Sequence, residues 1–182
     1  MAGDPVEVWF AKRAGNKLGR LRVSDMGSAT IYYFRPPSPR DQPQVFEHMS
    51  TGSGSQPWDI EVGPDGAPWF IEPHSNRVGN YTPGTLTYFN WYELPVSSST
   101  PYGLDIAQGV TWFTEKDGNR AGQLQPLKGI LREFALPGAA PTEIAVDATG
   151  CAWIAASNQD KLIRWCPPYF QFAHLPLVRR DK

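Results

Sequence analysis

A tryptophan motif recurs four times along the 182-residue chain and limits the fold more than any other feature. Each Trp is followed at once by Phe or Ile, after seven residues by Asn or Asp, and after eight by Lys or Arg. The copies begin at Trp9, Trp69, Trp112 and Trp153, so the spacings are 60, 43 and 41 residues. A period in the low forties is typical of a β-propeller blade. The sequence therefore predicts an all-β chain, a β-propeller of four blade-like repeats.

Turn residues divide a repeat into four short strands. In the second repeat we expect an inner strand over 57–62, further strands over 68–72 and 77–81, and an outer strand over 86–94. Gly, Pro, Asp and Asn stand between these segments, as turns require. We predict one domain, residues 1–182, with blades over about 5–37, 57–96, 101–138 and 141–177.

The first repeat is short at its start. Trp9 has eight residues ahead of it, whereas the Pro that opens an inner strand precedes the Trp of later repeats by 11 or 12. The first blade should therefore lack its inner strand and leave a strand edge open. We predict an incomplete ring: four blades with imperfect closure, half of a dimeric eight-bladed ring, or a piece completed by another subunit.

Residues 38–56 exceed the usual spacer between blades, and residues 50–55 have the Ser/Gly composition of a flexible linker. This insertion is predicted to be a lid or partner-binding loop, or a tolerated surface insertion.

Most of the recurring residues suit a scaffold. The Trp and the Phe or Ile can fill the wedge between adjacent sheets. The Asn or Asp can bond its own backbone after a turn. Gly stands ten residues after the Trp in the first three copies, where it allows two backbones to approach closely.

Charge and cysteine content exclude several classes. The formal net charge is −1, with no run of about 18 apolar residues, so neither nucleic acid nor membrane is the expected partner. No signal peptide is visible, so a cytoplasmic location is the default. Cys151 and Cys166 could meet across neighbouring strands, but we expect unpaired thiols.

Two runs of the chain resemble the blades of the virginiamycin B lyase (streptogramin lyase) family: Gly63 to Glu72 with Asn76 to Gly79, and Trp112 to Glu115 with Asn119 to Gly122. The resemblance covers about residues 5–177 apart from the insertion. It implies a seven-bladed propeller and an enzyme that linearises a cyclic depsipeptide by elimination across its ester bond. The family chemistry uses magnesium, a His base and nearby Glu residues.

The catalytic His of that motif is not found here. The family places Glu and His beside the Pro that opens an inner strand, but this chain has Gln56 and Trp58, Thr100 and Tyr102, and Ala140 and Thr142 there. A general base must reach the proton that it removes. The chain is therefore not expected to be an enzyme on its own.

A ligand site is expected at the mouth of the propeller channel, where strand-connecting turns open on one face. Its predicted residues are Trp58, Asp59, Tyr102, Glu72, His74 and Glu115. Glu72 and Glu115 match a family carboxylate and are the metal candidates, unless they only bond backbone groups at strand ends. Magnesium is the expected cofactor if the chain is an enzyme, and otherwise none is expected.

Two functions compete. The first is a non-catalytic binding or assembly propeller that forms a homo-oligomer or binds another protein subunit, or a small ligand, at the channel-mouth face. The alternative is a metal-dependent lyase or lactone hydrolase that uses Glu72, Glu115 and Asp59. Nucleic-acid binding lacks clustered stacking aromatics.

Overall fold

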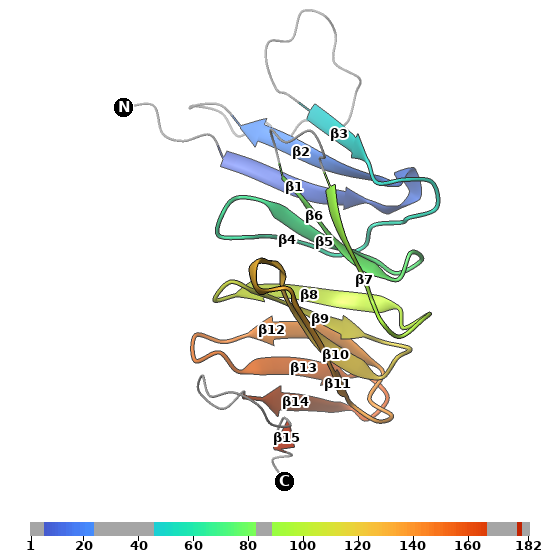
Figure 1. Cartoon of the computed structure of the whole chain (residues 1–182), viewed down its shortest axis with the longest axis vertical. Coiled ribbons are helices and arrows are strands. Elements are labelled where there is room, and N and C mark those ends of the chain that lie inside the picture. The colour runs from blue at the N-terminus through green and yellow to red at the C-terminus, as the bar shows by residue number, and fades with distance from the viewer. Residues whose placement is uncertain (1–5, 24–45, 83–88, 167–177, 180–182) are drawn as a thin grey trace, which may run out of the picture.

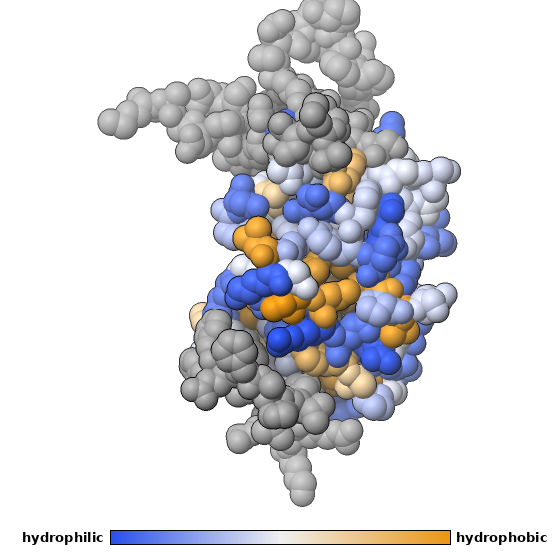
Figure 2. Space-filling view, viewed as in Figure 1, coloured by the Kyte–Doolittle hydropathy of each residue, from blue (hydrophilic) through white to orange (hydrophobic). Residues whose placement is uncertain are grey.

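The chain folds as a stack of antiparallel β-sheets. The computed structural model describes residues 6–23, 46–82, 89–166 and 178–179. Four sheets follow one another in chain order, from the N-terminal sheet at one end of the stack to the C-terminal sheet at the other (Figure 1). This arrangement confirms an incomplete β-propeller. Figure 2 shows patches of exposed apolar residues over the middle of the stack, bordered by hydrophilic residues.

Consecutive strands pair within each sheet, so each repeat forms one blade. The first sheet contains β1 (Val6–Lys12), the 3-10 turn η1 (Arg13–Gly15), β2 (Lys17–Val23) and β3 (Phe46–Ser50). The second contains β4 (Ile60–Val62), β5 (Pro68–Glu72), β6 (Arg77–Tyr81) and β7 (Phe89–Glu93). The third contains β8 (Pro101–Ala107), β9 (Val110–Glu115), β10 (Arg120–Gln125), the 3-10 turn η2 (Pro126–Lys128) and β11 (Ile130–Ala135). The fourth contains β12 (Pro141–Val146), β13 (Ala152–Ala156), β14 (Lys161–Trp165) and β15 (Val178–Arg179).

The first sheet has three strands among the described residues and the other three have four, as the short start of the first repeat predicts. Two predicted limits are wrong. Strand β3 lies inside the predicted insertion 38–56, where it pairs with β2 from Leu21↔Phe46 to Lys17↔Ser50. Strand β15 lies beyond the predicted end of the last blade at 177. Strand β3 pairs with β2, and strand β15 pairs with β14. The parts of the predicted blades over 24–37, 83–88 and 167–177 lie outside the described residues.

Residues 50–55 do not form the predicted flexible linker. Thr51 and Ser55 are buried, at 3% and 1% exposure, and their hydroxyl oxygens lie 2.6 Å apart. The Thr51 amide also donates to the Asn16 carbonyl at 3.0 Å. Thr51 and Ser55 therefore belong to a tight, hydrogen-bonded junction between the first two sheets.

The repeated aromatic residues fill the spaces between sheets, which confirms their predicted packing role. Trp69 clusters with Leu104 of the third sheet, and Trp112 clusters with residues of the fourth. Phe70 clusters instead with Trp9 of the first sheet. Since successive side chains of a strand point to opposite faces, the Trp of each motif packs on the following sheet and the Phe on the preceding one.

The motif Gly makes room for an aromatic ring rather than for a second backbone, so that part of the prediction is wrong. A Cβ atom added to Gly122 would lie 2.1 Å from the Phe113 ring, and Gly19 and Gly79 meet the Phe of their own motifs in the same way. The fourth copy pairs Ile154 with Ile163 at these positions. Two Ile side chains of medium size thus take the place of the large Phe ring and the Gly, which has no side chain.

The motif Asn also acts differently from the prediction. The three Asn residues have φ near +50°, and each side-chain oxygen accepts a hydrogen bond from the connection that leads into the next sheet. The donors are the backbone amides of Gln56, Ser99 and Ala140, and the acceptors are Asn16, Asn76 and Asn119. This residue therefore joins neighbouring blades instead of bonding only its own turn.

Cys151 and Cys166 form a disulfide bond, so the expectation of unpaired thiols is wrong. They flank β13 and β14, whose register brings Ala152 opposite Trp165 and the two cysteines to a Cα separation of 4.2 Å. Strand pairing alone therefore supplies the proximity that a disulfide needs.

Candidate aromatic and carboxylate sites

Two aromatic side chains from neighbouring sheets meet where the inner strands begin. Trp58 and Tyr102 each follow a Pro that opens an inner strand. Their ring centroids lie 5.2 Å apart, with the planes tilted by 45°. Trp58 is 37% exposed and Tyr102 is half-buried, so the pair presents ring surface to solvent. The structure thus brings together two of the residues predicted at the channel mouth.

A cationic group lies over each of these rings. The Arg13 guanidinium lies 4.3 Å from the centre of the Trp58 ring, and the Lys116 ammonium lies 5.0 Å from that of Tyr102. Arg13 also donates from Nε to Oε1 of Gln56 at 3.3 Å. We call Arg13, Trp58, Tyr102 and Lys116 the mouth row.

The two cations of the mouth row were missed by sequence reasoning. Arg13 and Lys116 both stand four residues after a motif Trp, whereas Pro73 and Ser157 occupy that position in the second and fourth copies. Comparing the copies at this position would have identified both cations.

Asp59 was predicted as a ligand residue, but its carboxylate joins two inner strands. One oxygen accepts from the Leu104 amide at 2.8 Å and the other from the Ile60 amide at 2.9 Å. Burial raises the pKa of Asp59, although both hydrogen bonds oppose the rise; Asp105 adds a smaller electrostatic contribution in the same direction as burial. The carboxylate therefore carries a clear structural role between the second and third sheets.

Asp105, which sequence reasoning did not select, repeats this role one sheet further on. Its side chain accepts hydrogen bonds from the amides of Val146 and Ile106. Glu61 and Glu143 are close enough to these aspartates that the pKa values of both are raised, mainly by partial burial and then by the negative charge of Asp59. A row of carboxylates thus runs along the inner strands.

Glu72 lies at the end of β5 and is fully buried, so its carboxylate is not exposed to solvent. Its Oε2 accepts from Nε of Arg77 at 2.7 Å. Burial raises the pKa of Glu72, while Arg77 and the hydroxyls of Thr51 and Ser55 act in the opposite direction. The carboxylate is therefore part of the junction between the first two sheets.

Glu115 occupies the same place in the third sheet and is also fully buried. Burial raises its pKa to about 7; the nearby Glu133 adds to the rise, and Ser99 and Arg120 oppose it. The side-chain oxygens of Glu115 and Nε of Arg120 do not form a close ion pair like that of Glu72 and Arg77. Glu115 is therefore a buried carboxyl group with a pKa near neutral.

His74 is exposed in the turn between β5 and β6 and forms no hydrogen bond or ion pair with other described residues. It lies after the strand end, so the structure provides no link between this imidazole and the mouth row. Its predicted part in a ligand site remains a prediction.

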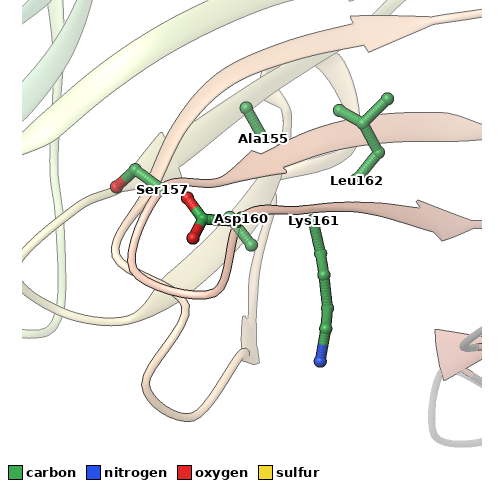
Figure 3. A pocket seen from close by; sticks show the side chains of 6 residues that line it. Ala155, Ser157, Asp160, Lys161 and Leu162 are labelled. Atoms are coloured by element: carbon green, nitrogen blue, oxygen red, sulfur yellow. The ribbon is translucent and has the colours of Figure 1, made fainter.

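A separate hollow of about 330 Å³ lies on the fourth sheet. It is lined by Ala155, Ala156, Ser157, Asp160, Lys161 and Leu162, which surround the turn between β13 and β14 (Figure 3). The Leu162 and Lys161 side chains project from β14 on opposite sides of the strand in this view. None of these residues belongs to the predicted site.

Metal ligands are not gathered in the described part of the chain. No group of three or more His, Cys, Asp or Glu side chains is placed there to hold an ion. The donors that the sequence predicts for magnesium fit poorly, because Glu72 already binds a guanidinium and Glu115 is buried beside another.

Comparison with known proteins places the chain in a family of β-propellers. The model of the Virginiamycin B lyase family matches residues 1–167. Two solved structures of virginiamycin B lyase from Staphylococcus aureus align with TM-scores of 0.71 and 0.70 at 23% and 26% identity, the second being a catalytically inactive variant with Quinupristin. A streptogramin B lyase structure aligns with a TM-score of 0.66 at 24% identity.

The alignments with both S. aureus structures cover 90% of this chain but only 50% of the lyase. The streptogramin B lyase is likewise covered over 52% of its length. The chain therefore spans about half the length of these solved relatives. No curated protein matches it. Among the described residues, no helix is long and apolar enough to cross a membrane.

Proposed function

This chain belongs to the virginiamycin B lyase family, and within that family we propose that it is a non-catalytic binding propeller that holds a small ligand on the mouth row. The observation that carries the proposal is the exposed Trp58–Tyr102 pair with a cation over each ring. The proposed ligand is a flat, negatively charged molecule. It stacks on the exposed ring surface and places its charge near Arg13 or Lys116.

The energetics favour such a ligand. Stacking on an aromatic ring contributes about 0.5–1.5 kcal/mol beyond the area that it buries. Arg13 and Lys116 attract an anion without a new buried charge, because both are near solvent. The contact network also holds the rings in place, since Arg13 is fixed by Gln56. Binding therefore loses little side-chain entropy.

The absence of a base beside the inner-strand prolines supports a role without catalysis. The side chains there are Gln56 and Trp58, Thr100 and Tyr102, and Ala140 and Thr142, and none of them is an imidazole or a carboxylate. Glu72 and Glu115 cannot replace the missing imidazole at the mouth, because both are fully buried.

Titration with 2-naphthoate, a flat aromatic carboxylate, tests the proposal. We expect saturable shifts of the Trp58 indole N–H resonance in NMR spectra. Trp58→Ala and Arg13→Gln should each weaken binding about tenfold, which corresponds to about 1.4 kcal/mol. Lys128→Gln, which removes a positive charge from the exposed turn η2, is the matched control and should bind as the unchanged protein does. Equal binding by the neutral 2-naphthamide, or by Trp58→Ala, would contradict the proposal.

The alternative function is a metal-dependent lyase or lactone hydrolase, which only the family membership favours. The poor fit of Glu72 and Glu115 to magnesium weighs against it. Incubation with quinupristin and Mg²⁺, followed by chromatography for a linear product, separates the two functions. Linear product that is lost in Glu115→Gln, together with calorimetric Mg²⁺ uptake, would establish the alternative and remove the proposal.

A further inference from the structure

The outer face of the fourth sheet has the side chains of a contact between blades but no following blade among the described residues. Trp153 is 39% exposed and Leu162 is 70% exposed. The register pairs Ala155 with Leu162, so these three side chains share one face of β13 and β14. Ala155 and Leu162 of this face also line the hollow in Figure 3, together with residues of the turn between β13 and β14.

The same positions are buried in the inner sheets. Trp69 and Trp112, which correspond to Trp153, are 8% and 3% exposed. Val78 and Ala121, which correspond to Leu162, are 0% and 2% exposed. In both cases the following sheet covers them. The fourth sheet is therefore built to be covered by another sheet of the same kind.

The first sheet has the complementary face at the opposite end of the stack (Figure 1). In the inner sheets, the face that carries the motif Phe packs on the Trp of the preceding sheet. Phe10 occupies that position in β1, with its ring over Gly19 as in the other repeats. Val8, on the same side of β1, is 47% exposed. One chain thus contains both halves of the contact, on opposite ends.

We propose that the outer face of the fourth sheet (Trp153, Ala155 and Leu162) binds the outer face of the first sheet, around the exposed Val8, of a second copy of this chain. A two-fold axis makes both contacts at once, so two copies close one ring of eight sheets. This inference does not depend on a ligand at the mouth row.

The assembly mass of the full chain tests the inference directly. At tens of micromolar we expect sedimentation to give about twice the 20.3 kDa of one chain. Leu162→Asp should weaken association at least tenfold, because it buries a charge in each contact. Leu127→Asp is the control: Leu127 is fully exposed on η2, away from both faces, and this variant should stay dimeric. Circular dichroism confirms that the variants keep their β-structure.

A mixing experiment tests which faces meet. Val8→Asp and Leu162→Asp each carry one altered face, so either variant alone loses both contacts of the ring. A mixture retains one contact between two unaltered faces and should form dimers that neither variant forms alone. A wild-type monomer at tens of micromolar would overturn the inference and leave the face to a different chain. A dimer unaffected by Leu162→Asp, a larger assembly, or a mixture that stays monomeric would also overturn it.

Discussion

Glu72 and Glu115 occupy equivalent positions in neighbouring sheets, but their carboxyl groups have different partners. Both end the second strand of a sheet, and both are opposite an Arg in the register, Arg77 and Arg120. Arg77 also stacks on Trp91 at 3.5 Å, which fixes it beside Glu72. The third sheet has Glu133 where the second has Trp91, so Arg120 lacks the ring that holds Arg77 in place. Glu115 and Arg120 form no close ion pair.

The stability of the protein should therefore depend on the charge of Glu115. Its pKa rises from 4.5 to about 7 on folding, so the folded state holds this proton more tightly. A group raised in this way stabilises the fold below pH 4.5, and that contribution disappears as the pH rises through 7. Glu115→Gln removes the ionisable group. We expect urea denaturation to show the variant more stable than wild type at pH 8 by about 2 kcal/mol, with a smaller difference at pH 5.

Glu93→Gln is the control for this comparison. The Glu93 side chain is 69% exposed and lies 3.8 Å from Arg77, so its contribution is expected to be within about 0.5 kcal/mol at either pH. If Glu115→Gln changed stability equally at pH 5 and pH 8, its effect would be one of packing rather than of ionisation.

At the scale of the element, the facing residues of the second and third strands of a sheet are matched to each other. Three sheets place a Phe ring over a Gly, and the fourth places two Ile residues opposite each other. Interiors are packed closely enough that a change on one strand must be matched on its neighbour. The motif is therefore a pair of positions rather than two separate preferences.

Exchange of this pair in the third sheet tests that view. Gly122→Ile alone drives a side chain into the Phe113 ring and should cost about 3 kcal/mol or more. Phe113→Ile alone leaves a cavity and should cost about 2 kcal/mol. The double variant reproduces the fourth sheet and should cost at least 1 kcal/mol less than the sum of the two. Chemical denaturation of all four proteins gives the coupling.

A mismatched double variant provides the control for the coupling. Gly122→Ile with Phe70→Ile alters two different sheets, so the two costs should add. A similar coupling in this variant would mean that the rescue is general and not a property of the paired positions.

The strands could be predicted where their signal is local, and were missed where it is not. Trp followed by Phe or Ile, bounded by turn residues, indicated β5, β9 and β13, because an apolar run and flanking turn residues coincide there. Strand β3 and the buried Thr51 depend on partners about 25 to 35 residues away. The aromatic pair of the mouth row was predicted from strand starts, but its cations required comparison across copies.

At the scale of the whole molecule, the same residue has a different energetic value according to its place in the stack. Trp112 lies between two sheets and is 3% exposed, whereas Trp153 lies on an end face and is 39% exposed. In a stack of repeats, stability is the sum of each repeat and its contacts with nearest neighbours. The sequence motif alone makes the two residues equivalent, because it does not say which sheets have neighbours.

Replacement of each Trp by Ala should reveal this difference. Trp112→Ala removes a side chain that packs against the fourth sheet and should cost about 3–5 kcal/mol. Trp153→Ala, measured in dilute Leu162→Asp protein so that only single copies are present, should cost about 1 kcal/mol, since its main partners are Asp147 and Arg164 on its own sheet. Hydrogen exchange should quicken in β12 to β14 for Trp112→Ala while β1 and β2 stay protected. Equal losses from the two replacements would mean that the stack unfolds without regard to its neighbour contacts, and would remove the basis for treating the fourth sheet as an uncovered blade.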